Sequence, residues 1–156
     1  MVDLTGVYRW PAGDRLVREL HLVAQLAGRR VLDLGCGPGQ CGWRAQELGA
    51  AAVVFADGSP AVVASRPEVL LHVWGDPVPG APFDVILGGD ILYRPECFAA
   101  LLRSIALALA PRGVALLSDP RPSLEPELPF LAADAGLTWT ASRRADYTLV
   151  TLALSA

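Results

Sequence analysis

Val31-Leu32-Asp33-Leu34-Gly35-Cys36-Gly37-Pro38-Gly39 is the stretch of sequence that decides the fold. Its first four residues predict a short buried strand, its glycines predict a tight turn, and a helix through Leu48 follows. Such a turn uses glycine because some positions need positive φ, and because a missing side chain lets a ligand approach the backbone. The stretch therefore predicts a strand, turn and helix unit suited to an adenosine-containing ligand.

The rest of the chain alternates between strand-like and helix-like segments. We expect further strands over 52–56, 69–74, 83–87, 114–117, 137–141 and 147–154, and helices over 13–27, 59–64, 95–110 and 127–135. This alternation predicts an α/β fold with a Rossmann-like, doubly wound sheet whose ligand lies at the carboxyl ends of the strands. The last two strands are close enough in sequence to form an antiparallel hairpin. We therefore expect a seven-stranded sheet that is mostly parallel.

Length and charge bound the class of protein. The 156 residues fit one domain over 1–156, and a hydrophobic content of 53% suffices for a sizeable core. The formal net charge is -3 and no basic cluster is present, so the electropositive face of a nucleic-acid binder is not expected. The chain contains no Lys, which we interpret as a compositional bias.

The cysteines and the hydrophobic runs indicate a cytoplasmic protein. Cys36, Cys41 and Cys97 are too few for a disulfide framework and lack partners at zinc-ligand spacing, so we expect reduced thiols and no metal. The first residues do not resemble a targeting signal, and no run reaches membrane-spanning length. We expect no membrane partner; the oligomeric state is left open, and a monomer is compatible with the sequence.

The glycine turn matches two cofactor patterns. Gly37-x-Gly39-x-x-Gly42 fits the dinucleotide pattern, whereas Gly35-x-Gly37-x-Gly39 fits that of the methyltransferases. Asp33, inside the first strand, favours the second pattern because a carboxylate suits a cationic amino group and repels a pyrophosphate. An oxidoreductase stays an alternative, although no Tyr-x-x-x-Lys pair accompanies the turn.

Two further segments supply candidate cofactor contacts. Asp57, followed by Gly58, ends the second expected strand, where a carboxylate can accept hydrogen bonds from both ribose hydroxyls. Trp74-Gly75-Asp76 ends the third expected strand and can supply an aromatic wall and polar contacts to an adenine ring. The alternative is that Trp74 is a core aromatic residue and Asp76 a turn residue.

The stretch from Val31 to Gly39 resembles the first motif of the class I, seven-stranded S-adenosylmethionine-dependent methyltransferases. Tyr8-Arg9-Trp10-Pro11-Ala12-Gly13 and Asp84-Val85-Ile86-Leu87-Gly88-Gly89-Asp90-Ile91-Leu92-Tyr93 resemble the family 16 methyltransferases, which include many protein-lysine methyltransferases. Together with Ser118-Asp119-Pro120-Arg121, they are most similar to the enzymes that methylate the β subunit of electron transfer flavoprotein.

This resemblance implies a site and an activity. The cofactor is S-adenosylmethionine, and the implied cofactor-binding residues are Trp10, Asp33, Gly35, Cys36, Gly37, Gly39, Asp57, Gly58, Trp74, Gly88 and Gly89. Asp90 and Tyr93 match an Asp-x-x-Tyr motif linked to catalysis and to binding of the substrate lysine. The plainer alternative is that Asp90 caps the following helix and that Tyr93 packs under it.

The expected activity is methylation of a lysine amine in a protein. Asp90 would orient the ammonium group and help to remove its proton, and Tyr93 would offer a hydrogen bond and an aromatic face. Two alternatives stay open: methylation of a small molecule at nitrogen or oxygen, and a non-catalytic partner subunit that only binds the cofactor. His21 and His72 are expected to be structural.

Overall fold

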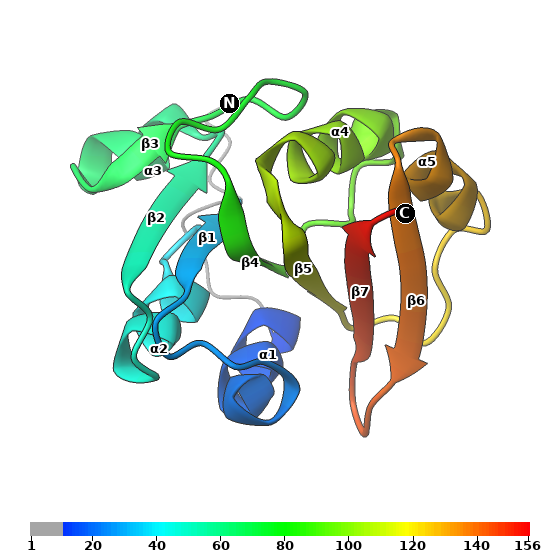
Figure 1. Ribbon diagram of the computed structural model, residues 1–156, viewed down its shortest axis with the longest axis horizontal. Coiled ribbons are helices and arrows are strands. Elements are labelled where there is room, and N and C mark those ends of the chain that lie inside the picture. The colour runs from blue at the N-terminus through cyan, green and yellow to red at the C-terminus, as the bar shows by residue number, and fades with distance from the viewer. Residues whose placement is uncertain (1–10) are drawn as a thin grey trace.

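The sheet of seven strands is the centre of the molecule (Figure 1). The computed structural model describes residues 11–156. The strands are β1 (Arg30–Leu34), β2 (Ala52–Asp57), β3 (Val69–Leu71), β4 (Phe83–Gly89), β5 (Leu109–Asp119), β6 (Leu137–Arg143) and β7 (Thr148–Leu154). Their order is β3-β2-β1-β4-β5-β7-β6, and β7 is antiparallel to both neighbours. The expected mostly parallel sheet with its C-terminal hairpin is confirmed.

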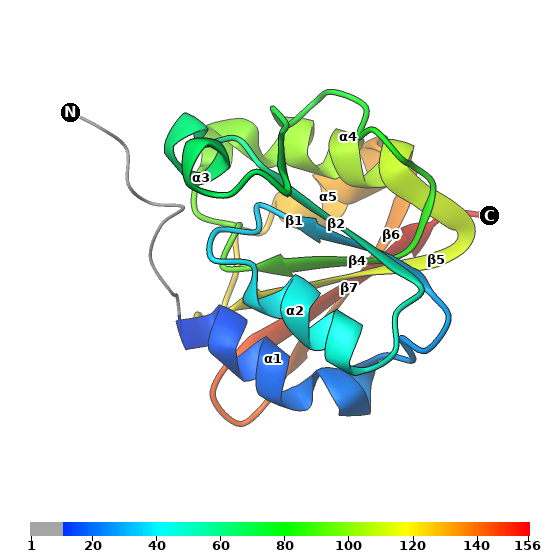
Figure 2. The ribbon, with the colours of Figure 1, turned by 90° about the vertical axis from the view of Figure 1, so that its left-hand side faces the viewer.

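Helices cover both faces of this sheet. They are α1 (Pro11–Val23), α2 (Gln40–Glu47), α3 (Pro60–Ser65), α4 (Phe98–Ala108) and α5 (Leu128–Asp134), with a 3-10 turn, η2 (Pro95–Cys97), before α4. In Figure 2 the sheet is seen nearly edge-on, with α1 and α2 below it and α4 and α5 above it. No helix within residues 11–156 has the length and apolar character needed to cross a membrane.

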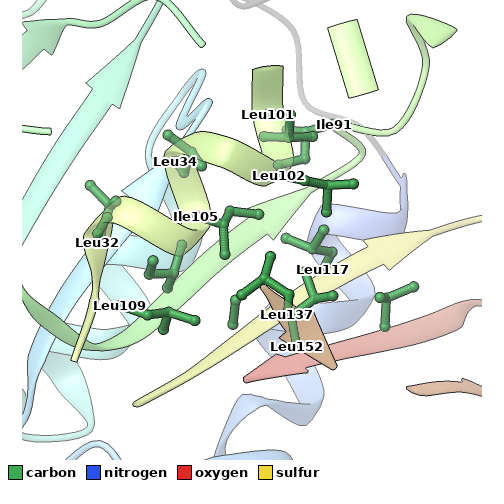
Figure 3. Packing of buried hydrophobic residues seen from close by; sticks show 14 of the residues in the cluster. Leu32, Leu34, Ile91, Leu101, Leu102, Ile105, Leu109, Leu117, Leu137 and Leu152 are labelled. Atoms are coloured by element: carbon green, nitrogen blue, oxygen red, sulfur yellow. The ribbon is translucent and has the colours of Figure 1, made fainter. Parts of the chain in front are cut away.

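Alternation along the central strands builds two buried layers. Leu32 and Leu34 of β1 pack toward α4, in the core cluster that Figure 3 shows. Val31 belongs to the opposite layer, with Leu16 of α1. Successive side chains of a strand point to opposite faces, and each fully buried Leu or Val contributes roughly 1.5–3 kcal/mol. The same alternation turns the Asp33 side chain toward α2, where it meets the start of that helix.

Two strands differ from their expected bounds. The third strand ends at Leu71 rather than at 74, because its neighbour β2 ends at Asp57, the residue that pairs with Leu71. The fifth strand begins at Leu109, five residues before its expected start. Between the pairs Phe83–Leu109 and Val85–Val114 its register shifts, so residues 111–113, which lie between the expected helix and the expected strand, belong to a bulge within the strand.

The first helix is shorter than expected. It ends at Val23 rather than at 27. Leu26 lies beyond the helix and is nevertheless buried in the same layer as Leu16 and Leu20. The apolar spacing in the sequence extends past the end of the helix because the loop that follows also packs against the core.

Candidate functional site

A cavity of about 580 Å³ opens at the carboxyl ends of β1, β2 and β4. It lies where the strand order reverses between β1 and β4, which is the usual ligand position in an open α/β sheet. Its walls are the β1–α2 turn, the start of α3, the segments that follow β3 and β4, and Gly13 in the first turn of α1. Its volume lies in the range of small-molecule sites.

Most of the glycine turn lines this cavity, from Gly35 to Pro38, whereas Gly39, which the sequence placed among the cofactor contacts, does not line it. Gly35 has a φ of 63°, and a Cβ there would lie 2.9 Å from Cγ2 of Ile91. Gly39 has a φ of 83° and precedes the first turn of α2; a Cβ there would lie 2.5 Å from Nη2 of Arg66. Both positions need glycine, for the left-handed backbone and for the close approach of a neighbour.

Asp33 is a buried carboxyl group at the inner end of the cavity. Its side chain is 2% exposed, and Oδ2 accepts a hydrogen bond from the backbone N–H of Gly42 at 2.8 Å. Burial raises the pKa of this carboxyl to about 7, although the hydrogen bond from Gly42 opposes the rise. A cationic group bound beside it would favour the ionised form.

Asp57 is held by the backbone on both sides. Oδ2 accepts a hydrogen bond from the Gly37 N–H at 2.9 Å, and Oδ1 accepts one from the Ser59 N–H at 2.8 Å. Each carboxylate oxygen has a second lone pair, so these bonds orient the group without exhausting its capacity to accept. Asp57 and Gly58 both line the cavity.

Trp74 joins the core and the cavity. It packs against the core cluster beneath α4, and its Cζ2 would lie 3.8 Å from a Cβ on Gly35. It also lines the cavity, so its position in the core is compatible with the predicted contact to an adenine ring. Asp76 does not line the cavity; its N–H donates to the Val73 carbonyl in a turn.

The outer end of the cavity holds Asp90 and Tyr93. Asp90 has a φ of 56°, a left-handed conformation that Asp tolerates better than most residues. Its Oδ2 accepts a hydrogen bond from the Gly13 N–H at 3.2 Å, so the helix that it caps is α1, not the helix that follows it. Tyr93 is 49% exposed rather than packed beneath that helix, with the Arg94 guanidinium 5.5 Å from its ring centre.

The remaining predicted residues divide into three groups. Cys36, Gly37 and Gly89 line the cavity, and burial raises the pKa of the Cys36 thiol, which suits a filling residue rather than a nucleophile. Gly88 does not line it, because Ile91 and Leu117 occupy the space beside its Cα. Trp10 lies outside the described residues.

Arg66 is the contact that sequence reasoning missed. Its Nη1 donates a hydrogen bond to the Gly37 carbonyl at 2.7 Å, and its guanidinium lies 5.4 Å from the ring centre of Phe55. It therefore supports the glycine turn from outside the cavity. Arg66 lies in a loop 29 positions from Gly37 and belongs to no motif, so the sequence offers no signal for this role.

Comparison with known protein families identifies the family of this chain. The methyltransferase domain family matches residues 11–152, which is nearly all of the described chain. The chain belongs to the methyltransferase domain family. The expected resemblance to class I S-adenosylmethionine-dependent methyltransferases is thereby confirmed.

Individual methyltransferases show similarity over part or all of the chain. Protein N-lysine methyltransferase METTL21A of Danio rerio is 34% identical over 70% of this chain and 58% of its own length. The electron transfer flavoprotein beta subunit lysine methyltransferase of Danio rerio is 37% identical over 54% of this chain and 37% of its own. The chain thus spans less than two thirds of the length of both relatives.

Other methyltransferases that match act on RNA. A tRNA U34 carboxymethyltransferase of Saccharophagus degradans is 31% identical over 69% of this chain and 37% of its own. The solved structure of the T. thermophilus 16S rRNA N2 G1207 methyltransferase, in complex with AdoMet and guanosine, superposes with a TM-score of 0.73. It is 24% identical and covers 96% of this chain and 44% of its own, which establishes a shared fold.

The residues of the cavity fit S-adenosylmethionine, the cofactor of this methyltransferase fold. A cationic amino group has a carboxylate partner in Asp33, a ribose has acceptors in Asp57, and an adenine ring has an apolar wall in Trp74. A pyrophosphate fits less well, because the Asp33 carboxyl group takes the Gly42 N–H at the start of α2. That N–H is one of the helix N-terminal donors that a phosphate would use.

Proposed function

We propose that the protein is an S-adenosylmethionine-dependent methyltransferase that methylates lysine side chains of proteins. The observation that carries this proposal is the placement of Asp90 and Tyr93 in the wall of one cavity, directly after Gly89 at the end of β4. A carboxylate and an aromatic ring with a hydroxyl group form a suitable pair for a primary ammonium group. The two lysine methyltransferases among the relatives support this choice of acceptor.

The chemistry needs an amine with a free lone pair. When bound, S-adenosylmethionine supplies a methyl group on a positively charged sulfur, and transfer is a displacement that depends on alignment. A lysine with a pKa of about 10.4 arrives protonated at neutral pH. Asp90 accepts a hydrogen bond from that ammonium group and takes its proton, directly or through a water molecule.

Tyr93 completes the acceptor side. Half of its side chain is exposed, so a substrate chain that reaches the cavity from solvent can contact both the ring face and the hydroxyl. The ring stabilises the positive charge that the nitrogen carries after transfer. We further infer that residues 1–156 act as one domain, because cofactor and acceptor groups line the same cavity.

The test is a transfer assay with radiolabelled methyl groups. The purified protein is incubated with labelled S-adenosylmethionine and cell lysate that has been separated into protein, RNA and small-molecule fractions. The chain contains no Lys, so labelled methyl-lysine cannot arise on its own side chains. The proposal predicts label in the protein fraction, recovered as methyl-lysine after hydrolysis, and its loss with Asp90→Asn. Label confined to RNA or to small molecules would overturn the lysine assignment.

A further inference from the structure

The segment that carries Asp90 and Tyr93 is attached to the end of β5 at two points. The backbone N–H of Asp90 donates to the Ser118 carbonyl at 2.9 Å. Two residues later, the Leu92 carbonyl accepts a hydrogen bond from Nη2 of Arg121 at 2.7 Å. The second attachment lies between Asp90 and Tyr93 and so fixes the backbone that orients both.

The Arg121 guanidinium is itself held in one orientation. Nε and Nη2 donate to the two carboxylate oxygens of Asp119 at 2.9 and 3.1 Å, and Nη1 donates to Oε1 of Glu125 at 2.6 Å. Asp119 is 3% exposed, so its carboxylate is a buried anchor. These ion pairs raise the pKa of Arg121, and a planar guanidinium is the one side chain that can make all four bonds.

The Leu92 carbonyl depends on this contact. Leu92 is fully buried, and its neighbour Ile91 is 3% exposed. A buried carbonyl that loses its donor keeps the cost of its desolvation without a compensating hydrogen bond, which favours a different backbone arrangement. Asp90, in a left-handed conformation, is the residue that a local rearrangement would move most readily.

We propose that Arg121 is a positioning residue for methyl transfer, which acts through the Leu92 carbonyl to hold Asp90 and Tyr93 against the acceptor. Arg121 does not line the cavity, so the role assigned to it here runs through the Leu92 carbonyl and not through a contact inside the cavity. This inference rests on the proposed function, because it assigns Asp90 and Tyr93 to the acceptor. It separates two tasks: β1 and β2 place the cofactor, and the end of β5 places the acceptor groups.

Arg143 provides a matched control. It lies near the same end of the sheet and donates to the Pro120 carbonyl and to Oγ1 of Thr148, each at 3.2 Å. Neither bond reaches the segment from Asp90 to Tyr93. Thr148 Oγ1 donates in turn to the Arg121 carbonyl at 2.7 Å, so Arg143→Ala alters the surroundings of the Arg121 backbone and keeps the guanidinium bonds of Arg121 to Asp119, Glu125 and Leu92. If the guanidinium is what positions the segment, Arg143→Ala should leave the segment and the activity unchanged.

The experiment compares Arg121→Ala, Arg121→Lys and Arg143→Ala in the full chain. Amide hydrogen exchange is followed in peptides covering 88–97 and 33–42, and S-adenosylhomocysteine affinity is measured by calorimetry. For Arg121→Ala we expect exchange over 88–97 to rise about tenfold or more, exchange over 33–42 to stay unchanged, and the Kd to change less than about threefold. Arg121→Lys, which keeps one donor, should be intermediate.

Steady-state kinetics with an acceptor that the protein methylates complete the test. Arg121→Ala should lower kcat about 10- to 100-fold and should recover part of it when guanidinium ion is added, while Arg143→Ala keeps parental kcat. Unchanged exchange over 88–97, an equal rise over 33–42, or unchanged kcat would overturn the proposal. The exchange and calorimetry arms need no acceptor, so failure to find a lysine substrate is separable from failure of this positioning role.

Discussion

Oδ2 of Asp90 accepts a hydrogen bond from the backbone N–H of Gly13, 77 positions earlier in the chain, at 3.2 Å. Gly13 is the third residue of α1, so its N–H is one of those that a helix leaves without an internal partner. A carboxylate there is also stabilised by the partial positive charge of the helix start. Asp90 thus holds α1 to the end of β4 while it lines the cavity.

Because Asp90 both caps α1 and lines the cavity, its substitution by Asn and its substitution by Ala should differ in their effect on stability. Asp90→Asn keeps an oxygen for the Gly13 N–H and tolerates the left-handed backbone, so we expect unchanged stability and a kcat about 100-fold lower. Asp90→Ala should lower kcat similarly and lose about 1–2 kcal/mol of unfolding free energy. Steady-state kinetics and urea denaturation measure both, and an Asn variant with parental kcat would remove Asp90 from the chemistry.

Two substitutions likewise distinguish the role of the Tyr93 hydroxyl from that of its ring. Tyr93→Phe keeps the ring that contacts Arg94 and removes one hydrogen bond to the acceptor, so kcat/KM should fall about tenfold. Tyr93→Ala should cost more, because the cation loses its aromatic face. The side chain is half exposed, so neither change should alter stability by more than about 0.5 kcal/mol. Equal kcat/KM for Phe and parent would exclude a role for the hydroxyl.

Asp57 should determine cofactor affinity. Asp57→Ala removes the acceptors of the Gly37 and Ser59 N–H groups together with those offered to a ribose, and we expect the Kd of S-adenosylhomocysteine to rise about 10- to 100-fold. Asp84→Ala is the control, since Asp84 accepts a similar bond from the Arg30 N–H at the opposite end of the strands. Calorimetric titration compares the variants, and equal weakening by both would show a general effect on the sheet.

Asp33 should make stability depend on pH. Its pKa rises from 3.8 in the unfolded chain to about 7 in the folded protein, so the folded state binds the proton more tightly. Its contribution to stability is therefore present below pH 4 and is lost as the pH rises to about 7. Asp33→Asn keeps an acceptor for Gly42 and removes this loss, which amounts to at most about 4 kcal/mol at pH 8.

The same substitution should weaken cofactor binding, because the amino group loses its anionic partner. Urea denaturation at pH 5 and pH 8, combined with calorimetry, measures both effects. The expected result is a variant that is more stable than the parent at pH 8 and binds S-adenosylmethionine less tightly. A variant whose stability relative to the parent does not change with pH would show that Asp33 is ionised throughout.

Substitutions of Gly28 and Gly39 distinguish the cost of backbone strain from the cost of a steric clash with a neighbouring side chain. Both have positive φ, at 83° and 74°, but a Cβ on Gly28 meets nothing within 4 Å, whereas one on Gly39 would lie against the Arg66 guanidinium. Gly28→Ala should cost about 1–2 kcal/mol of unfolding free energy, and Gly39→Ala more, because Arg66 must move. Thermal denaturation of both variants checks this order. Equal costs would mean that Arg66 yields freely.

The parts of the fold that were predictable are those set by neighbours in sequence. The apolar run from Val31 to Leu34 and its glycines identified the first strand and turn, because buried parallel strands are nearly continuous in apolar residues. The end of β3 at Leu71 was not predictable, since it depends on where β2 stops. The bulge in β5 likewise depends on its pairing with Phe83.

The site residues also differ in whether the local sequence could predict them. Residues at the carboxyl end of a strand, such as Asp57 of β2 and Gly89 of β4, reach the cavity as the topology requires. Gly88 was placed there too, but successive residues of a strand alternate in direction, and it meets Ile91 and Leu117 instead. Arg66 and Arg121 make side-chain contacts across 29 positions each. Arg66 belongs to no motif, and the quoted motif that contains Arg121 does not indicate its contact with Leu92.

Ile91 lies against two glycines: Gly35, which lines the cavity, and Gly88, which does not. A Cβ on Gly88 would lie 2.5 Å from Cδ1 of Ile91, and one on Gly35 would lie 2.9 Å from its Cγ2. Ile91→Val removes the Cδ1 atom and keeps Cγ2, so it relieves the shortest contact beside Gly88 and none beside Gly35; Cδ2 of Leu117, 2.7 Å from a Cβ on Gly88, would still block that position. The order of substitutions in evolution is therefore constrained: the side chains at positions 91 and 117 both have to become smaller or move before position 88 can gain a side chain, and the reverse order passes through a destabilised intermediate.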